Sequence, residues 1–182
     1  NLTATATTGN LTDGGTVTVS GPATFVTSAD DADVTLNELE VTGDMAVTTN
    51  GSSGNATLAN ATGIDFGSST VDGNLTATAT TGNLTDEETV TVSGTATFVT
   101  STDDADITLN ELAVTGDIAV TTNGRRGNVT LANATGIDFG SSTVDGNLKA
   151  TDTNGKANEK KADTVRRTAA VENKNEDEES EL

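Results

Sequence analysis

The chain has 182 residues, and its 28 acidic residues outnumber its 9 basic residues, which gives a formal net charge of −19. A surface this acidic repels nucleic-acid phosphates and anionic lipid headgroups, so we expect no nucleic-acid partner and no membrane insertion. The chain contains neither cysteine nor histidine, which removes disulfides, the usual zinc ligands and the commonest catalytic bases and nucleophiles. The composition therefore argues against an enzyme.

An almost perfect internal repeat begins at the first residue. Residues 1–73 and 74–146 align without insertion or deletion and differ at ten positions, so 63 of 73 positions are identical. The start of a third copy follows at Gly146-Asn147-Leu148. We predict that residues 1–148 form one repeat domain built from the units 1–73 and 74–146.

A shorter motif, Val-x-Gly, divides each unit into three sub-repeats. In the first unit it lies at 19–21, 41–43 and 71–73, and the next one ends at Gly94, so successive glycines are 22, 30 and 21 residues apart. Steps of this size match single turns of a solenoid. The spacing predicts about three coils in each 73-residue repeat.

Apolar residues recur at every second position around each Val-x-Gly motif. This alternation is typical of a β-strand with one buried face. Threonine fills many of the alternate positions, and its branched side chain favours extended backbone. The sequence thus predicts an all-β parallel solenoid with a thin aliphatic interior, whose inward residues include Val19, Val41, Val71, Ala23, Met45, Leu75, Phe25, Val47 and Ala77.

Two acidic clusters are candidate ligands for calcium, which prefers oxygen atoms from carboxylates. They contain Asp30, Asp31 and Asp33 in the first unit and Asp103, Asp104 and Asp106 in the second. The chain contains neither an EF-hand loop nor a glycine-rich calcium-binding nonapeptide, so a solvated turn is the competing interpretation. We expect no other cofactor.

Threonine pairs raise a second surface hypothesis, because some flat β-solenoid faces with Thr-x-Thr in every coil bind ice. The pairs Thr3-Ala4-Thr5 and Thr16-Val17-Thr18 have this form, but such pairs do not recur at one position of each sub-repeat. We therefore interpret threonine as a good outward strand residue.

Three runs of the sequence, at 63–71, 73–79 and 89–98, resemble the repeats of filamentous-haemagglutinin-type proteins, which are large bacterial surface proteins with many β-strand repeats. The resemblance covers residues 1–148. It implies a right-handed parallel β-helix, export to the cell surface or medium, and a role in adhesion or in building a surface layer. It implies no catalytic residues.

The pattern stops at Lys149, and residues 149–182 contain seven of the nine basic residues followed by an acidic run at 176–179. We predict a charged C-terminal tail that is either disordered or forms a cap, with a short helix considered for Thr164 to Val171.

These observations lead to one functional expectation. The chain is a stiff stalk or fibre segment of an extracellular or cell-surface protein, and its partners are cell-surface or matrix components, or copies of itself. The alternative is a self-assembling filament subunit or a calcium-dependent surface-layer or matrix component.

Overall fold

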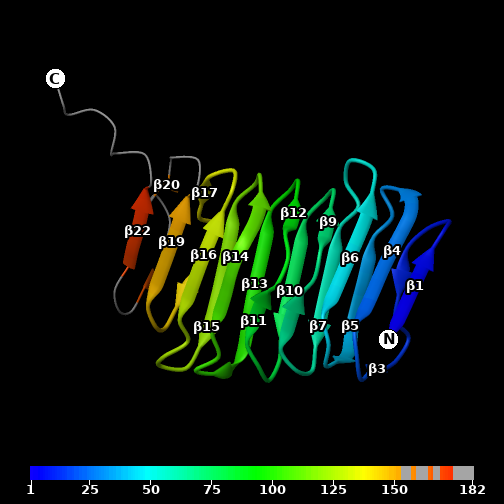
Figure 1. Ribbon diagram of the computed structural model, residues 1–182, viewed down its shortest axis with the longest axis horizontal. Coiled ribbons are helices and arrows are strands. Elements are labelled where there is room, and N and C mark those ends of the chain that lie inside the picture. The colour runs from blue at the N-terminus through cyan, green and yellow to red at the C-terminus, as the bar shows by residue number, and fades with distance from the viewer. Residues whose placement is uncertain (153–156, 159–163, 166–168, 174–182) are drawn as a thin grey trace.

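The computed structural model describes residues 1–152, 157–158, 164–165 and 169–173, the last three ranges by their backbone alone. In this part of the chain, parallel strands stack into a β-solenoid of about seven turns. The strands lie across the long axis of the rod, and β1 (Leu2–Ala6) and β22 (Ala169–Asn173) lie at opposite ends of it (Figure 1). The predicted all-β solenoid is confirmed. No helix of the length and hydropathy needed to cross a membrane occurs among the described residues.

Sheet A forms one side of the rod and contains eleven strands. Its strands are β1 (Leu2–Ala6), β4 (Ala23–Asp30), β6 (Met45–Asn50), β8 (Ile64–Phe66), β9 (Ser69–Val71), β11 (Leu84–Asp86), β12 (Val90–Val92), β14 (Ile107–Val114), β16 (Val129–Asn133), β19 (Leu148–Asp152) and β22 (Ala169–Asn173).

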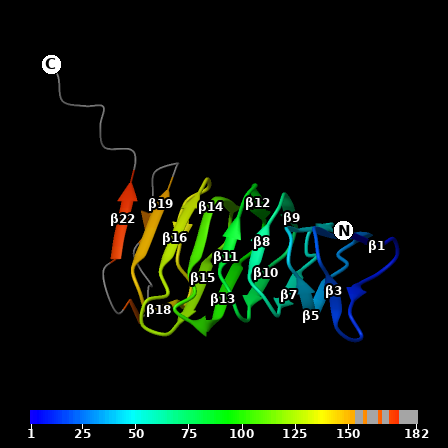
Figure 2. The ribbon, with the colours of Figure 1, turned by 60° about the horizontal axis from the view of Figure 1, so that its bottom comes forward.

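Sheet B forms the opposite side and contains nine strands. Its strands are β2 (Leu11–Thr12), β3 (Val17–Val19), β5 (Val34–Val41), β7 (Ala56–Asn60), β10 (Leu75–Ala79), β13 (Ala96–Asp103), β15 (Ile118–Asn123), β18 (Thr143–Val144) and β21 (Thr164–Val165). A separate pair joins β17 (Ile137–Asp138) to β20 (Ala157–Asn158). Figure 2 shows the two sides of the rod from a tilted direction.

Each turn of the chain contributes one strand position to sheet A and one to sheet B. Some positions are filled by a long strand such as β5, and others by two short strands in succession, such as β2 and β3, which both pair with β5. One repeat fills seven such positions, from β1 to β8 and β9, so a 73-residue repeat makes three and a half turns. The estimate of about three coils was therefore half a turn short.

The half turn moves each copy of the sequence to the other side of the rod. Strands β1 and β10 have the same sequence, Leu-Thr-Ala-Thr-Ala, yet β1 lies in sheet A and β10 in sheet B. The third copy, β19, is in sheet A again. In the predicted stack of valines, Val19 and Val41 do pair in register, whereas Val71 lies in the opposite sheet. The 30-residue step between glycines is therefore the one that contains the extra half turn.

The inward residues form one continuous core along the rod. All nine of the predicted inward side chains are buried, and Ala23 pairs with Met45 and Phe25 with Val47 as the alternation requires. Phe66 and Phe98 meet edge to face, with ring centroids 6.4 Å apart. Burying a side chain of this size stabilises the fold by about 1.5–3 kcal/mol, so the narrow interior is the main source of stability.

Glycines make the close corner at which the chain passes from sheet A to sheet B. The amide of Gly73 donates to the carbonyl of Gly54, that of Gly94 to Gly73, and that of Gly116 to Gly94, at 2.9–3.0 Å. A Cβ atom on Gly94 would lie 2.7 Å from the Gly73 carbonyl oxygen. Successive turns can therefore stack at this corner only if the residue has no side chain.

The C-terminal segment continues the winding. Strand β19 crosses the expected boundary at Lys149 and pairs with β16, while β21 pairs with β18 and β22 with β19. The described residues of the helix considered for Thr164 to Val171 are in strands β21 and β22, and residues 166–168 lie outside the described part. The other residues for which a disordered tail was predicted (153–156, 159–163 and 174–182) also lie outside it.

Candidate functional site

The predicted acidic clusters lie at turns that lead from β4 to β5 and from β13 to β14. Asp31 and Asp104 adopt positive φ angles of 58° and 61°. The Asp31 Oδ1 atom accepts hydrogen bonds from the backbone amides of Ser52 (2.8 Å) and Ser53 (2.9 Å) in the next turn. Asp104 binds the equivalent amides of Arg125 and Arg126 in the same way. These two carboxylates hold one loop onto the next.

Hydrogen bonding lowers the pKa of both carboxyl groups. For Asp31 the main cause is the amide of Ser52, and for Asp104 it is the amide of Arg125. A carboxylate that accepts backbone N–H bonds is stabilised in its charged form. Each group is therefore ionised at neutral pH and acts as a turn cap.

Asp33 and Asp106 belong to columns of polar side chains that follow the edges of the rod. Asp33 Oδ1 accepts from the amide of Asn55, whose own Oδ1 accepts from the amide of Asn74, and Asn74 Oδ1 accepts from Thr95. Asp30 Oδ1 accepts from the side chain of Asn50. Each of these acidic side chains bonds to the next turn, not to its neighbours in the cluster.

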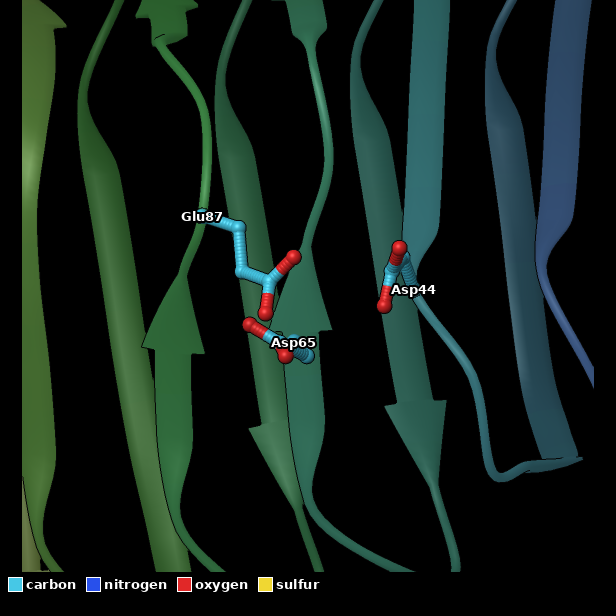
Figure 3. Close-up of side chains that lie close together, drawn as sticks. All are labelled: Asp44, Asp65 and Glu87. Carbon is cyan, nitrogen blue, oxygen red and sulfur yellow. The ribbon is translucent and has the colours of Figure 1, made fainter.

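A different acidic group is brought together by the fold. Asp44, Asp65 and Glu87 each offer a carboxylate oxygen, and these oxygens lie within 4.8 Å of one another. It is the one such group of three or more ligand-type side chains in the described residues. The residues come from three successive turns along sheet A, and Asp65 and Glu87 point toward each other (Figure 3). We call this group the acidic triad.

The geometry of the acidic triad suits a hard cation. Ligand atoms that share a calcium ion at 2.3–2.6 Å can be at most about 5 Å apart, and the triad meets this limit. Asp44 and Glu87 are exposed and Asp65 is half-buried, so water could complete the coordination shell. Asp65 also accepts a hydrogen bond from the Thr85 hydroxyl at 2.8 Å, which fixes its orientation.

A hollow lies beside Asp65 of the triad. Its lining includes Asp65 and Thr85 together with three glycines, Gly43, Gly63 and Gly82. A Cβ atom on any of these glycines would meet the backbone of a neighbouring turn at 2.5–2.7 Å, so they allow the turns to approach closely here.

The sequence does contain a signal for the triad, although its three residues do not form a cluster in the sequence. Glu87 stands where the first repeat has Gly14, and this is one of the ten differences between the repeats. Asp44 and Asp65 belong to the first repeat, so the triad forms only across the junction with the second. The counterparts in the next junction are Asp117, Asp138 and a lysine, Lys160, which lies outside the described residues.

Threonines form a regular column on the outer face of sheet B. Register pairs connect five of them on successive strands, namely Thr12, Thr35, Thr57, Thr76 and Thr97. The column is not evident in the sequence, because its members are 19–23 residues apart. A second outward position on β7, β10, β13 and β15 carries only threonine, alanine or valine. We call this uncharged surface the threonine face.

Together these features define a repetitive parallel β-solenoid whose outer surfaces are acidic edges and a threonine face. The chain belongs to a family of repeats of unknown function (DUF5649), whose model matches residues 1–39, 53–121 and 126–175. The matched region includes most of the C-terminal segment that continues the winding. No curated protein and no solved structure matches the chain.

Proposed function

We propose that this chain is a stiff structural segment of an extracellular or cell-surface protein, in which the solenoid provides length and its outer faces contact cell-surface or matrix components. A role similar to that of filamentous-haemagglutinin-type repeats accounts for the features described above. In this proposal the chain has no catalytic activity.

The continuity of register across the repeat junction is the observation that supports this proposal. Strand β10 of the second repeat pairs with β7 of the first residue by residue, from Leu75 with Ala56 to Ala79 with Asn60. Core, glycine corner and polar columns all pass through the junction without interruption. Repeats joined in this way add length without adding a hinge.

The threonine face gives the rod a surface for contact. Its residues carry no charge, whereas the chain as a whole has a net charge of −19. A neutral surface can approach another polymer without the repulsion that the acidic edges produce. We infer that the threonine face supplies the adhesive contacts.

Rod length provides the first test. Inserting another copy of residues 74–146 between the two repeats should lengthen the rod by about 17 Å, since three and a half turns stack at about 4.8 Å each. Small-angle X-ray scattering would measure the increase in maximum dimension. An unchanged maximum dimension, or a bent particle, would contradict a stiff stalk.

Location and adhesion are tested separately. Antibody labelling of intact source cells should detect the chain at the surface, and labelling only after lysis would oppose the proposal.

In binding assays on cell-wall or matrix material, Thr76→Glu with Thr97→Glu should reduce retention, whereas Thr18→Glu, outside the column, should not. Equal retention of the unmodified protein, the double variant and Thr18→Glu would refute adhesion by the threonine face.

The acidic triad favours a second candidate, a calcium-dependent surface-layer or matrix component. If calcium binds there, added calcium should raise the melting temperature of the chain and a chelator should reverse this change. Asp65→Asn should abolish the increase, while Asp33→Asn, at a predicted ligand outside the triad, should leave it intact. Loss of the effect in Asp33→Asn alone would instead favour the cluster predicted from sequence.

A further inference from the structure

We infer that the rod displays one contact surface twice, on opposite sides, so that a single chain joins two molecules of a neutral polysaccharide. The inference rests on the proposed function, because it adds a second site to the adhesive role of the threonine face and names the partner. It follows from the half turn by which each 73-residue repeat exceeds three whole turns.

The first surface lies on sheet A, on the successive strands β4, β6 and β9. Outward side chains of β4 pair in register with those of β6, and an outward side chain of β6 pairs with one of β9. The alternate side chains Phe25 and Val47 are buried in the core, so the residues beside them in each strand face outward. We call this surface patch A, and it consists of Thr24, Val26, Ala46, Thr48 and Thr70.

The second surface is a copy of the first on sheet B. The equivalent strands β13, β15 and β18 pair with one another in the same register, and Thr97 pairs with Ala119 where patch A pairs Thr24 with Ala46. None of the ten differences between the repeats falls on either surface. We call the second surface patch B, and it consists of Thr97, Val99, Ala119, Thr121 and Thr143.

The two patches point away from each other. They lie on the opposite sheets of the rod (Figure 2) and are displaced along it by three and a half turns, which is about 17 Å at about 4.8 Å per turn. A flat surface that contacts one patch therefore cannot contact the other. Two sites that cannot engage the same partner surface add no avidity, so each patch recruits a partner of its own.

The composition of the patches favours an uncharged partner with many hydroxyl groups. Both patches contain only threonine, valine and alanine. All four phenylalanines of the chain are buried, and it has no tryptophan or tyrosine, so the patches lack the large anchors on which protein interfaces depend. Threonine hydroxyls both donate and accept hydrogen bonds, and turns about 4.8 Å apart present them in a regular row. A polymer of identical hydroxyl-bearing units matches such a row.

Acidic side chains at the border of each patch disfavour an anionic polymer. Asp44 directly precedes β6 of patch A, and its copy Asp117 directly precedes the Ile118 that begins β15 of patch B. Both carboxylates are exposed, and the chain as a whole has a net charge of −19. Carboxylate or sulfate groups on a polymer would be repelled here, whereas a neutral polysaccharide would not.

A layered binding assay tests the inference with the full chain. Hydroxyethyl cellulose, a neutral polysaccharide, is immobilised as a film, the chain is applied, and fluorescent hydroxyethyl cellulose is added in a second step. The unmodified chain should be captured and should retain the labelled polymer, since one patch faces the film and the other faces the solution. Alginate, an anionic polysaccharide, should bind roughly tenfold less in either layer.

Matched variants remove one patch at a time. Thr24→Glu with Thr48→Glu alters patch A, and Thr97→Glu with Thr121→Glu makes the identical change in patch B. Each double variant should still be captured through its remaining patch but should lose the labelled second layer. All four substitutions together should abolish capture, whereas Thr18→Glu, outside both patches, should behave like the unmodified chain.

The outcomes separate this inference from the proposed function. If the unmodified chain were captured without retaining the labelled polymer, or if either double variant retained it, the cross-linking role alone would be overturned. Capture that survived all four substitutions would instead refute adhesion by the threonine face. No capture by hydroxyethyl cellulose, with retention on cell-wall or matrix material, would overturn the neutral polysaccharide as partner. If the glutamates lower the β-sheet signal in circular dichroism, glutamine at the same four positions alters the patches without adding charge.

Discussion

Replacing Asn60 with alanine tests how the solenoid satisfies its buried polar groups. Asn60 lies at the end of β7 and is fully buried. Its Oδ1 atom accepts from the amide of Val41 at 2.8 Å, and its Nδ2 group donates to the carbonyls of Val41 and Gly63 at 2.9 and 2.6 Å. The Asn60 side chain thus makes the hydrogen bonds that the backbone of an adjacent strand would otherwise make with Val41.

The cost of Asn60→Ala can be estimated from these contacts. Val41 is buried, so its amide would be left without a partner, at a cost of about 1–3 kcal/mol. Its carbonyl keeps the hydroxyl of Thr62 as a donor, which limits the further loss to about 1 kcal/mol. We expect a total of about 3 kcal/mol, equivalent to a fall in melting temperature of roughly 6–12 °C in a chain of this size.

Thermal unfolding followed by circular dichroism would measure this fall. Asn133 makes the same contacts with Val114 in the second repeat, so Asn133→Ala should be similarly destabilising. Asn83→Ala is the matched control, because Asn83 is exposed and its side chain accepts one hydrogen bond, from the amide of Asp106. If Asn60→Ala melted no lower than Asn83→Ala, the argument from buried polar groups would be refuted.

Three further predictions concern the corner glycines, the turn caps and the net charge. Gly94→Ala should destabilise the rod by about 1–3 kcal/mol through its contact with Gly73, whereas Gly14→Ala, with open space around its Cβ position, should melt near the unmodified protein. Folding lowers the pKa of the Asp31 carboxyl group, so the contribution of Asp31 to stability should be complete above the ordinary pKa of 3.8. This contribution should be lost as the pH falls through the lower pKa of the folded state. Acid titration of Asp31→Asn should therefore show a flatter dependence of stability on pH in this range. Raising sodium chloride from about 0.1 M to about 1 M shortens the screening length from roughly 10 to 3 Å and should raise the melting temperature, since the net charge is −19; a decrease would show that repulsion between carboxylates does not limit stability.

The sequence predicted the core well because two independent patterns agree. Alternating apolar residues identify the inward positions. Because the two repeats are almost identical, each inward position should be buried in both copies. Val19, Ala23 and Phe25 could be assigned to the interior for this reason, and they are buried. Their partners were harder to assign, because the Val-x-Gly motif precedes a corner on either side of the rod.

The candidate site was harder to predict because it depends on contacts between turns. Asp30, Asp31 and Asp33 are neighbours in sequence, but strand geometry and the turn direct their side chains to the following turn. Asp44 and Asp65 are 21 residues apart and meet only because one turn has that length. Predicting the triad would have required the register between turns, which depends on the half turn in each repeat.

The half turn also has a consequence for how such proteins change length. Gain or loss of one 73-residue unit by recombination reverses the side on which everything beyond it is displayed, whereas gain or loss of two units restores the original orientation. Parity in the number of units therefore determines whether distant surfaces of one molecule face the same way. A partner that binds two of these surfaces at once would distinguish rods with an odd number of units from rods with an even number.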